Sequence, residues 1–193
     1  MPVAANCADP HPVHTVGHST REIDVFLALL CAHAVDLVVD VRRWPASRRH
    51  PHFAREALEA SLAAAGIAYV WRRDLGGFRT PAPDSPNIGW RVKAFRGYAD
   101  FMLTPEFERA IGEVEALAAS RRIALMCAEA VPERCHRRLL ADACTVRGWS
   151  VRHVLDGGCA AHRLTPFARP SGTRLLYPAD GQTELAGCAP DGR

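Results

Sequence analysis

Residues 36–41 read DLVVDV, and this short stretch decides the fold. A nearly continuous apolar run of this length, rich in valine, is typical of a strand buried on both faces of a parallel sheet. Four more strand candidates flank it along the chain: VHTVG at 13–17, IAYVW at 67–71, IALMC at 123–127 and VRHVL at 151–155. Helices are predicted between them, at about 20–33, 54–65 and 104–120, and from about 132 or 135 to 147. This alternation predicts an α/β fold with three layers: a mostly parallel central sheet of about five strands with helices on both faces.

Local signals support the helix boundaries. Ser19 and Glu22 are three residues apart, as in a capping box, so the first helix is expected to begin at about residue 20. Gly66 is placed to end the second helix, and Thr104 followed by Pro105 to begin the third. Residues 74–96 show no such pattern, and they are expected to form a loop that folds over the functional site as a lid, with Arg79, Trp90 and Arg91 placed to cover a ligand. A surface excursion held by its prolines is the alternative.

Length and composition indicate one globular domain. The chain has 193 residues, of which 48% are hydrophobic and 23% charged. We expect a tail at 1–12, a single α/β domain at 13–170 and a partly irregular tail at 171–193. No apolar run reaches the roughly 18 residues of a membrane span, so no membrane association is expected. The basic excess of +3 carries little weight, because 23 of the 24 basic residues are arginine, a bias typical of GC-rich coding.

The cysteines indicate a reducing compartment. Seven cysteines are an odd number, and the first residues show neither the basic nor the apolar region of a secretory signal. A disulfide framework is therefore not expected, and the predicted location is cytoplasmic.

The strand ends place the predicted site. In parallel α/β sheets, ligands bind at the carboxyl ends of the strands. Three predicted strands end in polar or reactive residues: Gly17-His18-Ser19, Asp40-Val41-Arg42 and Cys127-Ala128-Glu129. We therefore expect His18, Ser19, Asp40, Arg42, Cys127 and Glu129 to line one cleft.

Cys127 is the main catalytic candidate, because it ends a buried strand where helix amides and cations favour a thiolate. The residues after it supply further reactive groups: Glu129, Cys135, His136 and Arg137. Cys127 is interpreted as the nucleophile, His136 or His18 as its base, and Glu129 as a proton carrier. Two other roles stay open: a redox pair with Cys135, or a divalent metal held by Cys127, Cys135 and His136. A structural role as a small buried side chain is also open.

The segment 42–53 mixes basic groups with Trp44 and Phe53, a composition that suits phosphate or nucleic-acid contacts but also a solvated loop. Arg42 and Arg137 are the predicted holders of an anionic group.

Five motifs in order resemble the bacterial and archaeal family called Domain of Unknown Function 488. They are TVGHST at 15–20, DVR at 40–42, LGG at 75–77, FRGYADFM at 95–102, and MCAE at 126–129 leading to CHR at 135–137. The resemblance spans about residues 15–169. It implies a small cytoplasmic α/β domain whose signature residues include those named above and Tyr98, but it brings no reaction with it.

Two function hypotheses follow. The first is a thiol-dependent enzyme, a cysteine-nucleophile transferase or hydrolase, acting on an anionic or phosphorylated substrate that includes nucleic acid as one class. Its catalytic candidates are Cys127, Glu129, His136 and His18, and its substrate-binding candidates are Ser19, Asp40, Arg42, Arg137 and Tyr98. The alternative is a binding module that holds a metal or nucleic acid in the same cleft without turnover. The sequence requires no cofactor, and it makes no statement about oligomeric state.

Overall fold

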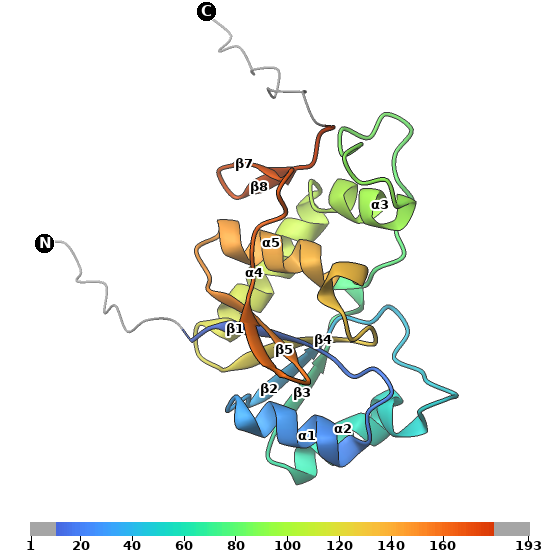
Figure 1. Ribbon diagram of the computed structural model, residues 1–193, viewed down its shortest axis with the longest axis vertical. Coiled ribbons are helices and arrows are strands. Elements are labelled where there is room, and N and C mark those ends of the chain that lie inside the picture. Colours follow the sequence, from blue (N-terminus) through green and yellow to red (C-terminus); the bar gives the residue numbers. More distant parts are fainter. Residues whose placement is uncertain (1–10, 180–193) are drawn as a thin grey trace, which may run out of the picture.

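A computed structural model describes residues 11–179, which form a six-stranded sheet between two layers of helices (Figure 1). The spatial order of the strands is β3-β2-β4-β1-β5-β6. Their bounds are Val13–Gly17 (β1), Leu37–Asp40 (β2), Ala68–Trp71 (β3), Ile123–Cys127 (β4), Val151–Leu155 (β5) and Gly158–Ala161 (β6). β1 to β5 are parallel and β6 is antiparallel to β5. The three-layer α/β prediction is confirmed, with β6 as an additional strand that returns from β5 in a tight turn.

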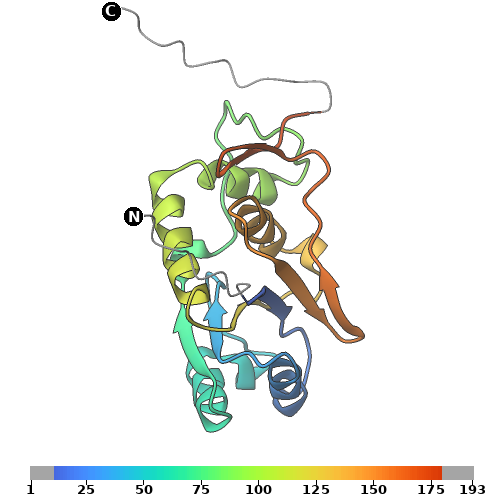
Figure 2. The same cartoon turned by 90° about the vertical axis from the view of Figure 1, so that its left-hand side faces the viewer.

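The helices divide between the two faces of the sheet. Helices α1 (Ile23–Ala32) and α2 (Arg55–Ala64) cover one face, and α4 (Pro105–Ala118) and α5 (Arg137–Val146) cover the other, with α3 (Lys93–Phe101) beyond them (Figures 1 and 2). Strand β2 shows why both faces need cover. Val38 packs with α1 and α2, whereas Leu37 and Val39 pack with the α4 and α5 side, and all three are buried. The stretch DLVVDV is therefore buried on both faces, as its apolar run predicts.

The start of α1 differs from the capping-box prediction. Ser19 has a left-handed backbone (φ 53°), and Glu22 takes the N-cap position without a side-chain hydrogen bond. The Ser19 N–H instead donates to the Ala128 carbonyl at 2.9 Å, so this segment follows the chain leaving β4. The capping-box prediction was wrong because the hydrogen bond from Ser19 to Ala128 fixes the backbone conformation at this position. The cap at Thr104 is confirmed, since its hydroxyl accepts the Phe107 N–H at 3.3 Å.

The segment 74–96 is only partly a loop, and α3, which the sequence did not predict, begins at its end. Trp90, expected to cover a ligand, is instead buried in the main core against Phe95, Phe167 and Tyr177. Only Gly77 and Phe78 of this segment border the candidate pocket. The prediction that Trp90 belongs to a lid was wrong, because the tryptophan has more apolar surface to bury in the core than over a polar pocket.

The packed region continues past residue 170, where the sequence suggested a tail. A hairpin of β7 (Arg169–Ser171) and β8 (Arg174–Leu176) leads to Tyr177, which is fully buried. The Tyr177 hydroxyl donates to Asp142 on α5 at 2.9 Å, and His162 contacts the same carboxylate at 2.8 Å. Asp142 therefore anchors the C-terminal segment to α5.

Some expectations fall on residues outside the described range 11–179. They are the N-terminal tail up to residue 10, the end of the C-terminal tail from residue 180, and the thiols Cys7 and Cys188. Among the described helices, none has the length and apolarity to cross a bilayer.

Candidate active site

A pocket of about 160 Å³ lies where β1, β2 and β4 end, at the carboxyl edge of the sheet. Its walls come from the segments that follow these strands and from the loop after β3. The lining residues are His18, Arg42, Arg43, Trp44, Ala46, Ser47, Gly77, Phe78, Cys127, Ala128 and His136. The pocket therefore combines a thiol, two imidazoles and guanidinium groups at the edge where the fold class predicts a ligand site.

Close packing at this edge explains Gly17, which pairs with Cys127 in the sheet. A Cβ at position 17 would overlap the carbonyl group of Glu129. Glycine therefore allows the chain leaving β4 to cross directly over the end of β1, which brings the Cys127 loop beside His18.

Arg42 is held in place by Asp40. The Asp40 carboxylate is fully buried and accepts from Arg42 Nε at 2.9 Å and Nη2 at 2.6 Å. Tyr69 adds a hydrogen bond of 2.7 Å to the same carboxylate. This bidentate pair leaves Nη1 to contact the Phe53 carbonyl at 2.7 Å and His18 at 3.3 Å. Asp40 is therefore a positioning group behind the pocket, and Arg42 is the residue that lines it.

His18 is buried and neutral near pH 7. Its Nδ1–H donates to the Ser19 carbonyl at 2.9 Å, and its ring stacks on Phe53 at 4.2 Å. Burial, together with the charge of Arg42, lowers the pKa of His18 to about 4. Its Nε2 faces Arg42, so His18 accepts a hydrogen bond from the guanidinium in the resting site.

Cys127, Cys135 and His136 form a compact group, which we call the dithiol cluster. One ligand atom of each lies within 4.8 Å of the others. His136 contacts the Val41 carbonyl through Nε2 at 3.2 Å and Cys135 Sγ through Nδ1 at 3.7 Å. Arg137 donates to Cys135 Sγ through Nε at 3.4 Å. The sulfur of Cys135 is thus surrounded by polar groups that favour its anion.

The two thiols of the dithiol cluster do not ionise alike. A hydrogen bond from Cys127 lowers the pKa of Cys135 well below the usual thiol value, and the contacts with His136 and Arg137 overcome the opposing effect of burial. The same hydrogen bond, together with burial, raises the pKa of Cys127. The sequence singled out Cys127 as the thiol with a lowered pKa, and this was wrong because the cationic and imidazole groups approach Cys135.

The two sulfurs also differ in solvent exposure, and the more exposed sulfur is the one with the higher pKa. Cys127 is half-buried and lines the pocket, whereas Cys135 is 4% exposed and lies behind it. The cluster therefore places the more acidic thiol inside and the less acidic thiol at the surface that a ligand reaches.

Four further predicted residues lie outside the pocket lining. Arg137 is fully buried and also donates to the Glu129 carbonyl, so it fastens the Cys127 loop. The fully buried Tyr98 donates to the Leu75 carbonyl at 2.9 Å and places its ring 5.1 Å from that of His136. The Glu129 side chain is exposed and accepts from the Val131 N–H at 3.2 Å. With Ser19, these residues border the site without lining it.

Close packing also explains Gly77. A Cβ there would lie 2.9 Å from His136 Nδ1, the atom that faces Cys135. Glycine keeps the loop after β3 against this imidazole without a clash.

The rim of the pocket carries two exposed aromatic side chains. Trp44 is 58% exposed and Phe78 is 75% exposed, with ring centroids 5.6 Å apart. Arg43 lies over the Trp44 ring at 5.2 Å and donates to the Phe78 carbonyl at 3.3 Å. Phe78 has a left-handed backbone (φ 61°), a strained conformation for this residue. The sequence indicated Trp44 as a contact residue, but Phe78 carries no local signal and only the tertiary fold reveals it.

A family model covers four of the five motifs given above, all but the one at 15–20. The family model described as Domain of unknown function DUF488 matches residues 22–144, more than half of the chain. The chain belongs to the DUF488 family. The matched region contains Arg42, Gly77, Cys127, Cys135 and His136 of the DUF488 site. No curated protein and no solved structure matches the chain.

Proposed function

We propose that this DUF488 protein is a thiol-dependent enzyme that acts on a small anionic or phosphorylated substrate through Cys127. The observation that carries the proposal is the dithiol cluster, in which the pocket-facing thiol of Cys127 lies within 4.8 Å of Cys135, whose sulfur contacts His136 Nδ1 and receives the Arg137 Nε–H. Cysteines that only fill space in a core are inert and have raised pKa values. The lowered pKa of Cys135 is therefore unusual for a cysteine with a packing role alone.

The cluster gives Cys127 a proton acceptor. As the Cys127 S–H proton passes to the Cys135 thiolate, the negative charge moves to Cys127, whose sulfur bonds the electrophilic atom of the substrate. The bond from that atom to the leaving group breaks, and the leaving group departs with the electron pair. His136 and Arg137 stabilise the resting thiolate from the inner side. In this assignment, Cys127 is the catalytic residue, whereas His136, Arg137 and Tyr98 position or polarise Cys135.

Arg42 supports the choice of an anionic substrate. Asp40 holds the Arg42 guanidinium at the pocket wall, and after the hydrogen bonds to Asp40, Phe53 and His18 one Nη2 N–H remains for a substrate oxyanion. The exposed rings of Trp44 and Phe78 suit a substrate that carries a planar group beside its anion, which includes nucleotides and nucleic-acid ends.

A metal-binding module is the second candidate for the same site. It is favoured by the donor set, since two thiols and the Nδ1 of an imidazole anchored on a backbone carbonyl match what zinc prefers. Either role needs reduced thiols, and the cytoplasm maintains them, so we place the protein there.

A three-substrate panel tests the enzyme proposal. The panel contains p-nitrophenyl phosphate for phosphate-ester hydrolysis, thiosulfate for sulfur transfer and an anionic aromatic disulfide for thiol exchange. We expect turnover of at least one compound, loss of that turnover in Cys127→Ser, and competition by inorganic phosphate.

The matched control is Cys31→Ser, which changes an exposed thiol on α1 that is not part of the pocket lining. Turnover that survives Cys127→Ser rejects the proposal. Absence of turnover, combined with zinc retention that Cys135→Ser abolishes, would favour the binding module instead.

A further inference from the structure

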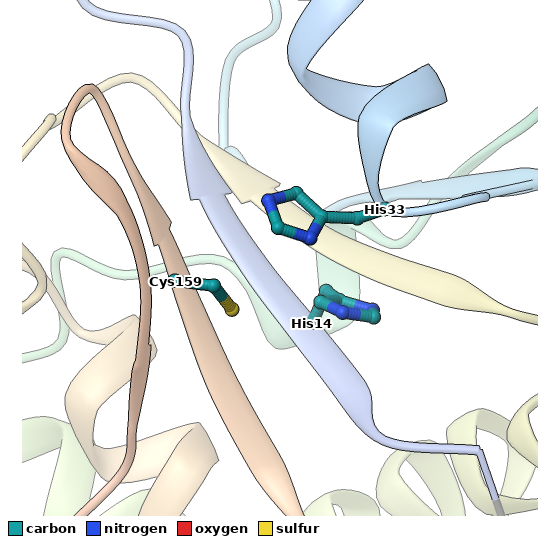
Figure 3. Close-up of side chains that lie close together, drawn as sticks. All are labelled: His14, His33 and Cys159. Carbon is teal, nitrogen blue, oxygen red and sulfur yellow. The ribbon is translucent and has the colours of Figure 1, made fainter.

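A second group of cysteine and histidine side chains lies away from the pocket, and we call it the imidazole cluster. It consists of His14 on β1, His33 at the end of α1 and Cys159 on β6 (Figure 3). One ligand atom of each lies within 4.8 Å of the others. None of the three lines the Cys127 pocket.

The topology explains why residues so far apart in sequence meet. His14 pairs with Arg152 on β5, and Val154 of β5 pairs with Cys159 on β6, so His14 and Cys159 lie on the same face of the sheet. Val16 and Val154 of this face pack against α1 and α2. Helix α1 ends beside it, and its C-cap residue His33 places its ring 5.4 Å from that of His14.

His14 supplies an independent sign that a ligand belongs here. The residue is only 5% exposed, and its Nδ1 has no hydrogen-bond partner among the described residues. A buried polar nitrogen without a partner has lost its hydrogen bonds to water, so a buried imidazole normally has a partner. Cys159 and His33 are half-buried, which leaves both free to reorient.

We infer that His14, His33 and Cys159 form a zinc-binding site. Two imidazoles and one thiolate are a donor set that zinc prefers, and they leave a fourth tetrahedral position for water or another ligand. Zinc bonds of about 2.0–2.3 Å require the donors to approach by about 1 Å, a shift within reach of side-chain rotation at His33 and Cys159.

The surroundings indicate what the fourth position takes. The cluster opens into a pocket of about 320 Å³, whose other lining residues are His11, Pro12, Arg122 and Arg152. His11 is within the same pocket and is a fourth candidate donor. The two guanidinium groups add positive charge beside the metal, and a zinc–thiolate unit is itself net positive. The open position therefore suits hydroxide or a small anion.

The test measures alkylation of each cysteine in the full-length protein by mass spectrometry, with EDTA or with added Zn²⁺. We expect Zn²⁺ to slow alkylation of Cys159 by at least about tenfold at pH 7.5, because the bound thiolate is no longer a free nucleophile. Cys31 is the internal control, since it is exposed on α1 only two residues before His33. Its alkylation rate is expected to stay constant.

His33→Gln tests the ligand set. His33 is half-buried, so the variant is expected to fold, and it should lose the protection of Cys159 while Cys31 stays unchanged. If Cys159 of the unmodified protein is alkylated at the same rate with and without Zn²⁺, the proposal is overturned. Protection that persists in His33→Gln overturns the three-ligand site. Because every cysteine is measured separately, metal bound at the dithiol cluster does not affect the readout at Cys159.

Discussion

The two cysteine–histidine clusters share one sheet and differ in how their polar atoms are satisfied. In the dithiol cluster, His136 is anchored on Val41, and Cys135 receives contacts from His136 and Arg137. In the imidazole cluster, the Nδ1 of His14 has no partner among the described residues. The first arrangement adjusts thiol acidity from within the protein, whereas the second leaves donor atoms that an external ion can use.

The arginines beside the two clusters differ in the same way. Arg42 at the pocket is 5% exposed and paired with a buried carboxylate, whereas Arg122 and Arg152 beside the imidazole cluster are exposed. A buried polar group keeps a fixed geometry because it needs its partner to offset the loss of water. An exposed polar group can exchange its partner for water and keeps no fixed geometry. The contrast suggests a preorganised reaction site at one cluster and an adaptable ion site at the other.

The largest expected effect comes from Asp40→Asn. The change leaves the Arg42 guanidinium buried without its counter-charge, so the free energy of unfolding should fall by about 3–5 kcal/mol. Arg152→Gln, which neutralises an exposed arginine beside the imidazole cluster, should change it by less than about 0.5 kcal/mol. Urea unfolding of both variants measures the difference. Equal losses of unfolding free energy in the two variants would show that the fold does not depend more on the Arg42 ion pair than on Arg152.

Cys135→Ser tests the shared proton. The contact with Cys135 is the first cause of the raised pKa of Cys127 and burial is the second, so the variant should lower that pKa, and alkylation of Cys127 by iodoacetamide at pH 7 should become about tenfold faster. Cys31 in the same sample provides the reference rate, since it is not part of the cluster. An unchanged rate at Cys127 would mean that Cys135 does not accept its proton.

Two hydrogen-bonded histidines extend the comparison to acid stability. Burial is the main cause that lowers the pKa values of His18 and His153 to about 4. His18 faces Arg42, His50 and His52, and His153 faces His162, Arg137, Glu133 and Asp142.

Between pH 6.5 and pH 4 the unfolded chain binds more protons at these two positions than the folded chain. Their contribution to stability is therefore complete above about pH 6.5 and is lost as the pH falls, with a slope of up to about 1.4 kcal/mol per pH unit for each histidine. Urea unfolding at several pH values measures this slope, and His18→Gln should reduce it. A stability that does not change from pH 7 to pH 5 would contradict the assignment.

Tyr98→Phe is expected to have a small effect. The variant removes the hydrogen bond to the Leu75 carbonyl but keeps the ring beside His136, so we expect a loss of about 1 kcal/mol in unfolding free energy. Cys127 alkylation should change by less than the effect of Cys135→Ser, because the cluster itself is intact. A larger change at Cys127 would show that the hydroxyl, and not the ring alone, positions His136.

The sequence determined the sheet and the edge at which its reactive residues meet. Continuous apolar runs such as 36–41 report burial on both faces, and the parallel order of the strands brings His18, Arg42 and Cys127 to one end. Strand burial and strand order follow from the hydrophobic periodicity and the order of elements along the chain, so they can be predicted from the sequence. The cap at Thr104 is equally local, since its hydrogen bond spans three residues.

Only the tertiary structure decided which thiol is acidic, where Trp90 and Ser19 go, and which distant histidines meet. The acidity of Cys135 depends on how His136 and Arg137 approach it, and Ser19 is held by the chain leaving β4. The imidazole cluster joins residues 14, 33 and 159 through strand register and the end of α1. Hydrogen bonds and desolvation act over a few ångströms, so they are fixed by spatial neighbours that one-dimensional spacing does not reveal.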